Sequence, residues 1–124
     1  MKISEFVEIA DKDKIYYMAS PYSHKEKVIQ AYNGDKVSRF SAYLMSLGFN
    51  IFSPIAYGEK MLEYYNLPTD AEYWWTINKA LLEIADILIV YKMDGWMESK
   101  GVERELNYSM IRGMEKIFLE VGEI

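Results

Sequence analysis

The chain contains no cysteine and a single histidine, His24, among its 124 residues. Disulfides and thiolate metal sites are therefore impossible, and a histidine-rich metal centre is excluded as well. No segment approaches the ~20 consecutive apolar residues that a membrane-spanning helix needs. The first residues carry charges where a secretory signal needs an apolar run. We therefore expect a cytoplasmic protein with no membrane partner, no metal and no other cofactor.

Basic residues are also scarce, because 14 Lys and Arg stand against 19 Asp and Glu and leave a formal net charge of −5. Nucleic-acid surfaces usually carry a basic stripe, so we expect no nucleic-acid polymer as a partner. Backbone amides can nevertheless bind a small phosphate on an acidic protein. The length suits one domain over residues 1–124, and 51% of the residues are hydrophobic, which is enough for a core.

Strands and helices alternate along the predicted fold. Apolar spacing predicts a continuous helical pattern from Lys25 to Leu47, which Asn33-Gly34 is expected to loosen or break. Long crossovers imply parallel strands, so we predict a three-layer α/β/α, Rossmann-like or flavodoxin-like sheet of four to five strands. The predicted strands are Lys14–Ala19, Asn50–Ser53, Asp86–Tyr91 and Lys116–Val121. The other predicted helices lie within residues 1–13, over 56–67, from a cap at Thr69 or Asp70 to Ile84, and from Gly101 to Gly113.

Two loops are expected to meet at the carboxyl edge of this sheet, where α/β proteins bind their ligands. The first spans Ser20 to Lys25 and the second Lys92 to Lys100. Ser99 stands just before the last helix, whose free amides favour an anion. Ser99 either contributes to an anion site or simply caps that helix. The first loop offers hydroxyl groups and an imidazole on Ser20, Tyr22, Ser23 and His24.

Two acids early in the last helix, Glu103 and Glu105, are candidates for an active carboxylate. With ~100° per residue, both lie roughly 80° from the centre of the stripe formed by Val102, Leu106 and Met110. Helical periodicity therefore does not distinguish them. The alternative is that both are solvated acids that favour the helix dipole.

Adjacent aromatic residues suggest an association surface. Trp74 and Trp75 point about 100° apart on a helix, so we expect only one of them to be fully buried. The other would stack on a base or lie in a subunit contact. Together with Tyr64 and Tyr65 they favour a homo-oligomer, a dimer or higher.

Several motifs follow one another in the order found in a known family, over about residues 14–120. On these motifs the chain resembles the nucleoside 2-deoxyribosyltransferase-like superfamily, in particular its small branch known as DUF1937. The motifs are Tyr16-Tyr-Met-Ala-Ser-Pro-Tyr-Ser-His24, Phe52-Ser-Pro-Ile55, Leu67-Pro-Thr-Asp70, Asp86-Ile-Leu-Ile-Val90, Gly95-Trp-Met-Glu-Ser-Lys-Gly-Val102 and Glu105-Leu-Asn-Tyr108.

The resemblance implies cleavage or exchange of the N-glycosidic bond of 2-deoxynucleosides or their monophosphates. Its Glu-x-x-Tyr pattern assigns the nucleophile to Glu105, and the strand tyrosine that helps to hold it to Tyr16. With Tyr16 and the helix dipole beside it, Glu105 is expected to be ionised at neutral pH. Ser99 stands six residues before Glu105, as in the nucleotide hydrolases of the superfamily, whereas transferases carry an aspartate there. The implied substrate site also includes Ser20 as a second phosphate contact, with Pro21, Tyr22, His24 and Gly101.

One position departs from the family pattern. Eight residues before Asp86 the family usually has an aspartate that assists protonation of the leaving base, and here Asn78 stands there. An amide can hydrogen-bond a base but cannot deliver a proton. Glu98 is a candidate replacement acid. The leading hypothesis is therefore hydrolysis of a (2-deoxy)nucleoside 5′-monophosphate by Glu105. The alternatives are a non-catalytic nucleotide-binding protein and a nucleoside 2-deoxyribosyltransferase.

Overall fold

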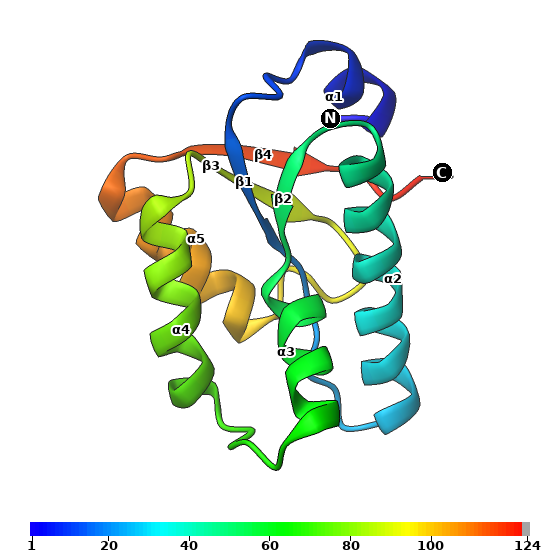
Figure 1. The fold of residues 1–124 in the computed structure, drawn as a ribbon, viewed down its shortest axis with the longest axis vertical. Helices are drawn as coiled ribbons and strands as arrows, with labels where there is room; N and C mark the ends of the chain where they lie inside the picture. The colour runs from blue at the N-terminus through cyan, green and yellow to red at the C-terminus, as the bar shows by residue number, and fades with distance from the viewer. Residues whose placement is uncertain (123–124) are drawn as a thin grey trace.

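The computed structural model describes residues 1–122, which form one parallel sheet surrounded by helices (Figure 1). The strand order is β2-β1-β3-β4, and every pairing is parallel. This confirms the predicted α/β/α architecture, with four strands in the flavodoxin-like order. The elements are α1 (Ile3–Ile9), β1 (Ile15–Ala19), α2 (Lys27–Ser46), β2 (Asn50–Phe52), α3 (Pro54–Tyr64), α4 (Ala71–Ile84), β3 (Ile87–Tyr91), α5 (Lys100–Arg112) and β4 (Glu115–Leu119).

Helices cover both faces of the sheet. Figure 1 shows α2 on one side, α4 and α5 on the other, and α3 between α2 and α4. Because successive strand residues point to opposite faces, β1 divides its side chains between the two layers. Tyr16 and Met18 pack under α1 and α2, whereas Tyr17 and Ala19 pack under α4 and α5. The central strands β1 and β3 are therefore buried on both faces, as parallel strands require.

Capping residues set the helix boundaries at the ends of strands. Ser53 Oγ accepts a hydrogen bond from Ala56 N at 3.2 Å, and Pro54 begins α3 directly after β2. Of the two predicted caps for α4, Asp70 is the one used, since its carboxylate accepts from Tyr73 N at 3.0 Å. Gly113 ends α5 with φ 68°, a left-handed conformation that glycine adopts without strain.

Two local predictions are wrong. Asn33-Gly34 does not break α2, because both residues are buried and the Asn33 amide donates to Tyr22 O at 3.3 Å. Tertiary packing here overrides a weak local helix propensity. Neither Trp74 nor Trp75 is fully buried: Trp74 lies against Gly58 of α3, and Trp75 packs against the edge of the core cluster under α4 and α5. Within residues 1–122, none of the helices combines the length and the hydropathy that crossing a bilayer requires.

Candidate active site

Glu105 is a buried acid on α5, with 7% of its surface exposed, whereas Glu103 is exposed. The loop after β3 leads into α5 at Ser99, and Glu105 lies in the second turn of that helix. Its Oε2 accepts a hydrogen bond of 2.5 Å from the hydroxyl group of Tyr17 on β1. Helical periodicity did not distinguish Glu103 from Glu105. The packing of α5 against the sheet does, because it buries only Glu105.

The tyrosine that holds Glu105 is Tyr17, so the expectation that Tyr16 does so is wrong. The two residues are neighbours on β1 and point to opposite faces of the sheet. Tyr16 lies under α1 and α2, where its hydroxyl group donates to the main-chain oxygen of Asp11 at 2.7 Å. Since α5 covers the other face, only Tyr17 can reach Glu105.

Burial raises the pKa of Glu105 from 4.5 to about 8, and the hydrogen bond from Tyr17 lowers that pKa only in part. About one molecule in ten would then carry the charge at pH 7. The expectation of an ionised acid at neutral pH is therefore wrong. Glu105 lies in the second turn of α5, six residues after the Ser99 cap, and the helix dipole falls off within the first turn. Burial and the neighbouring Glu105 raise the pKa of Tyr17 well above its usual value, so Tyr17 is the hydrogen-bond donor of the pair.

Two of the site residues predicted from the sequence carry buried polar atoms without a hydrogen-bond partner within residues 1–122. They are Ser20 Oγ, at the carboxyl end of β1, and Asn78 Oδ1, on α4. Asn78 lies three residues after Trp75 and four before Leu82, which both pack in the cluster that contains Tyr17. It therefore faces the same layer as Glu105. Buried polar atoms without partners are rare, and a bound ligand is one explanation for them.

Ser99 caps α5, because its Oγ accepts a hydrogen bond from Val102 N at 3.2 Å. The capping interpretation is thus confirmed. The hydroxyl hydrogen is still free to donate, and the first amides of a helix have no partner within it. Gly101 is exposed in this first turn. A phosphate contact at Ser99 and Gly101 stays a prediction.

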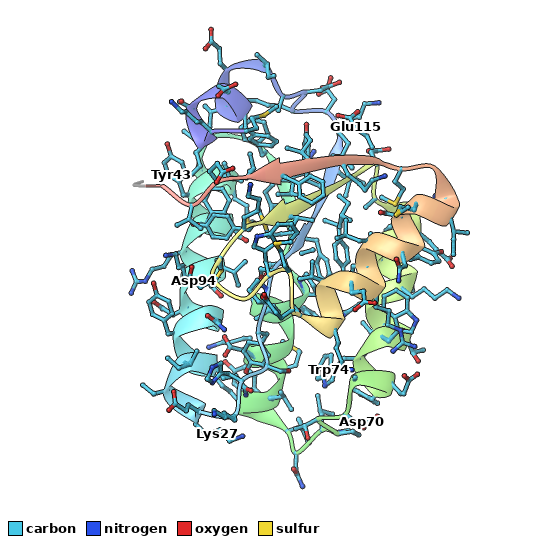
Figure 2. All side chains as sticks on the ribbon, turned by 180° about the vertical axis from the view of Figure 1, so that it is seen from behind. Lys27, Tyr43, Asp70, Trp74, Asp94 and Glu115 are labelled. Atoms are coloured by element: carbon cyan, nitrogen blue, oxygen red, sulfur yellow. The ribbon has the colours of Figure 1, made fainter. Side chains whose placement is uncertain are left out.

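The other predicted site residues of the first loop are Pro21, Tyr22 and His24, and none of them contacts Glu105 by a hydrogen bond in residues 1–122. Pro21 is buried, and the Tyr22 hydroxyl donates to Glu59 Oε2 at 3.0 Å. His24 is exposed, and its Nδ1 accepts from Glu26 N at 3.0 Å, which shapes the turn into α2. The loop nevertheless lies at the end of the molecule where α2 and α4 begin, marked by Lys27 and Asp70 in Figure 2.

Glu59 on α3 is a second partly buried acid, and the sequence reasoning missed it. Burial is the main cause that raises its pKa. Its carboxylate lies directly against Gly34 of α2. A glycine that interrupts a helical pattern without ending the helix was the available signal, because such a residue often marks a close contact. The sequence did not identify the acid that would fill this space.

Glu98, the candidate replacement acid, is exposed.

Two surface hollows lie away from the Tyr17–Glu105 pair. One, of about 620 Å³, is formed by α1, Tyr43 and residues 120–122. The other, of about 220 Å³, lies between α3 and α4 and is lined mainly by aromatic residues, Trp74 among them. Neither hollow is lined by Glu105, Tyr17 or Ser20. Within residues 1–122, no group of three or more histidine, aspartate or glutamate side chains is placed to hold a metal ion.

Comparison with known proteins identifies one family. The model of a domain of unknown function, DUF1937, matches residues 14–120. No curated protein matches the chain. The matched segment includes β1, the Tyr17–Glu105 pair, Ser20 and Asn78. The description of the family assigns no activity.

Proposed function

The chain belongs to the DUF1937 family, and we propose that it hydrolyses the N-glycosidic bond of a (2-deoxy)nucleoside 5′-monophosphate with Glu105 as the nucleophile. The observation that carries this proposal is the buried hydrogen bond between Tyr17 and Glu105. Tyr17 belongs to β1, which pairs with β3 at the centre of the sheet. The chain leaves these two strands in opposite directions, and α/β proteins bind ligands at such a reversal.

Each predicted group has a role that fits its position. The 5′-phosphate accepts hydrogen bonds from the hydroxyl groups of Ser20 and Ser99 and from the first amides of α5. The carboxylate of Glu105 attacks C1′, and the C1′–N bond breaks with its electron pair passing to the base. Water then attacks C1′ of the glycosyl-enzyme, which releases the sugar phosphate and restores the carboxylate. Tyr17 orients the attacking group through its hydrogen bond.

The base leaves with a proton that Asn78 cannot supply. The amide of Asn78 can still hydrogen-bond the base, and its unpartnered Oδ1 is available for an amino group of that base. The proton then comes from solvent or from Glu98. Loss of a general acid typically costs 10²–10⁴-fold in rate, so we expect slow turnover.

The reaction needs the ionised form of Glu105, and its pKa of about 8 makes that form the minor one at neutral pH. We therefore expect kcat/KM to rise with pH, to reach half of its plateau near pH 8 and to level off above that pH, because this parameter reports the free enzyme. Tyr17 stays protonated throughout this range, since its own pKa is raised.

The main alternative is a nucleotide-binding protein without catalysis on the same fold. Asn78 in place of an acid and the raised pKa of Glu105 both favour it. A nucleoside 2-deoxyribosyltransferase is the third possibility, and the resemblance disfavours it because Ser99 stands where transferases carry an aspartate.

The test is incubation of the protein with a panel of deoxynucleoside and ribonucleoside 5′-monophosphates, with and without an acceptor base. Free base alone indicates a hydrolase, and a new nucleoside indicates a transferase. Neither product, together with binding by calorimetry, indicates a binding protein. Base release that survives in the Glu105→Gln variant would refute the assigned nucleophile.

We also propose that the chain forms a homo-oligomer through the aromatic surface between α3 and α4. The hollow there is lined by Tyr64 and Tyr65, which are 67% and 77% exposed, and by Trp74. Exposed apolar patches of this kind often mark protein contacts. Light scattering of the wild type and of a Tyr65→Ser variant tests the oligomer. Location in the cytoplasm stays a prediction.

A further inference from the structure

Glu59 takes no part in the proposed reaction, yet its position is fixed by two other elements. It lies on α3, which begins directly after β2. The hydroxyl group of Tyr22, on the loop after β1, donates to Glu59 Oε2 at 3.0 Å. The main-chain oxygen of Tyr22 in turn accepts from the amide of Asn33 on α2, at 3.3 Å. The acid is therefore held by a tyrosine whose backbone is held in turn by α2.

Gly34 makes room for the carboxylate. A Cβ atom at Gly34 would lie 2.2 Å from Glu59 Oε1 and 2.4 Å from Oε2, closer than any real contact. The φ angle of Gly34 is not positive, so the helix does not need glycine there for conformational reasons. Glycine is unfavourable in a helix interior relative to alanine. The position of Gly34 in α2 is therefore explained by the approach of Glu59.

The carboxylate has capacity for one more partner. Oε2 of Glu59 accepts the hydrogen bond from Tyr22. Oε1 accepts no hydrogen bond from residues 1–122. Burial and the charges of Asp35 and Glu63 raise the pKa of Glu59, so its surroundings disfavour the charge. A neutral hydrogen-bond donor is the partner that such a carboxylate accepts, whereas a phosphate group would be repelled.

The loop that holds Glu59 also carries Ser20, a residue with 5% of its surface exposed, whose buried Oγ has no hydrogen-bond partner in the described chain. Ser20 stands two residues before Tyr22. Aromatic contacts connect the same region to the reacting pair, because the ring of Phe52 lies 5.8 Å from Tyr17 and 5.9 Å from Tyr57 on α3. The first loop thus links the predicted phosphate contact with the acid on α3.

We propose that Glu59 is a specificity-determining residue, whose carboxylate accepts a hydrogen bond from a sugar hydroxyl group of the bound nucleotide. This inference rests on the proposed function, since it takes a nucleoside monophosphate as the ligand. The phosphate and the hydroxyl group are then recognised by different groups: Ser20 and Ser99 bind the anion, and Glu59 binds the neutral donor.

The test measures binding in the Glu105→Gln background, where turnover does not interfere. Calorimetry gives the Kd of a nucleoside 5′-monophosphate and of its 2′,3′-dideoxy analogue, which lacks the sugar hydroxyl groups. We expect the hydroxylated nucleotide to bind about tenfold or more tightly, as is typical of a hydrogen bond to a charged group. The ratio of the two Kd values is expected to fall to about one when Glu59→Ala is added. Glu59→Gln, which keeps an acceptor oxygen, is expected to retain part of the preference for the hydroxylated nucleotide.

Gly34→Ala is a second variant that leaves Glu59 in the sequence. The added methyl group displaces the flexible carboxylate and improves the local helix propensity, so the protein is expected to fold. We expect this variant to lose the preference as Glu59→Ala does. Gly58→Ala is the matched control, because its added Cβ would meet the Trp74 ring at an ordinary 3.5 Å. The preference is expected to survive there.

The outcomes separate the two proposals. A preference that persists in Glu59→Ala and Gly34→Ala, or one that is absent from the parent protein, overturns the role of Glu59 while nucleotide binding and base release stand. If the protein neither binds nor cleaves any nucleoside monophosphate, the proposed function and this inference fall together.

Discussion

Under α1 and α2 the sheet is covered by aromatic and aliphatic side chains, and Phe6 and Phe49 pack edge-on against Tyr16 at centroid distances of 5.4 and 6.1 Å. The hydroxyl group of Tyr16 is satisfied by a main-chain oxygen. Under α4 and α5 the next residue, Tyr17, instead contacts a buried carboxyl group, Glu105. In one layer, the hydroxyl group of the buried tyrosine is satisfied by the backbone. The other keeps an acid whose charge its surroundings disfavour, and such conflicts are typical of functional sites.

The largest expected effect comes from removing the acid of the second layer. Glu105→Gln preserves shape and the hydrogen bond from Tyr17, but it removes the nucleophile. We expect base release to fall by at least about 10³-fold, as for other essential nucleophiles. The rate of base release from the best nucleotide of the panel measures this. A variant with wild-type rate would place the chemistry elsewhere.

The same substitution is expected to stabilise the protein in a pH-dependent way. Below pH 4.5 the carboxyl group is protonated in both the folded and the unfolded state, so it adds no pH dependence. Between pH 4.5 and about 8 only the folded state keeps the proton, so wild-type stability falls as pH rises. At about 1.4 kcal/mol per pH unit, Glu105→Gln is expected to gain on the order of 3 kcal/mol at pH 7. Urea unfolding at pH 5 and pH 8 checks the sign, and an equal difference at both values would contradict the burial argument.

The second comparison uses the two tyrosines of β1. Tyr17→Phe removes the one hydrogen bond that lowers the pKa of Glu105, so that pKa is expected to rise further. Each unit of increase lowers the ionised fraction at pH 7 by about tenfold, and kcat/KM with it. The pH–rate profile is the measurement, and its rising limb is expected to shift to higher pH.

Tyr16→Phe is the matched control for this prediction. It removes a hydroxyl group from the other layer, where the partner is Asp11 O. We expect a loss of about 1 kcal/mol in the free energy of unfolding and an unchanged pH–rate profile. A profile that shifts in Tyr16→Phe and not in Tyr17→Phe would return the role to Tyr16.

Much of the architecture could be predicted because it depends on local patterns. Segments rich in β-branched and aromatic residues formed strands, and two helices begin at the predicted caps Asp70 and Ser99. Long crossovers between strands required parallel pairing. The continuity of α2 across Gly34 is the exception, because it depends on tertiary contacts that local propensity does not contain.

The site was predicted only in part, because its pairs join distant elements. The resemblance placed the acid on the last helix correctly, but it assigned the tyrosine of the first strand to Tyr16, whose neighbour Tyr17 holds the acid instead. The choice of Tyr17 depends on the face that α5 covers. Likewise, the contact of Glu59 with Gly34 joins α3 to α2, and no spacing along the chain encodes it. The raised pKa of Glu105 depends on burial, which the helical wheel did not determine.

A smaller effect is expected from the buried polar atoms that have no hydrogen-bond partner in either layer of residues 1–122. Asn78 Oδ1 belongs to α4, and Ser41 Oγ belongs to α2, in the layer on the opposite face of the sheet. Asn78→Leu and Ser41→Ala each remove a buried atom without a partner, so each is expected to stabilise the fold by about 1 kcal/mol. Only Asn78→Leu is expected to weaken nucleotide binding. Thermal unfolding and calorimetry on both variants test this, and weakened binding in Ser41→Ala would remove the functional distinction between the layers.

The smallest effect is expected on the outer surface of the α4–α5 layer. The guanidinium group of Arg104 lies 4.7 Å from the centre of the Trp75 ring and donates two hydrogen bonds to Glu72, at 2.8 and 3.1 Å. It therefore joins α5 to α4, whereas the pair between Arg39 and Asp35 stays within α2. Exposed ion pairs contribute little, and salt screens them.

The matched variants are Arg104→Ala and Arg39→Ala. We expect a small loss in Tm for the first and a smaller one for the second, because only Arg104 also covers an aromatic ring between two helices. The ion-pair part is expected to shrink in 1 M salt, and the stacking part to persist. Thermal unfolding at low and high salt measures both. Equal losses at both arginines would show that the contact of Arg104 with the Trp75 ring adds no stability beyond that of an ordinary surface ion pair.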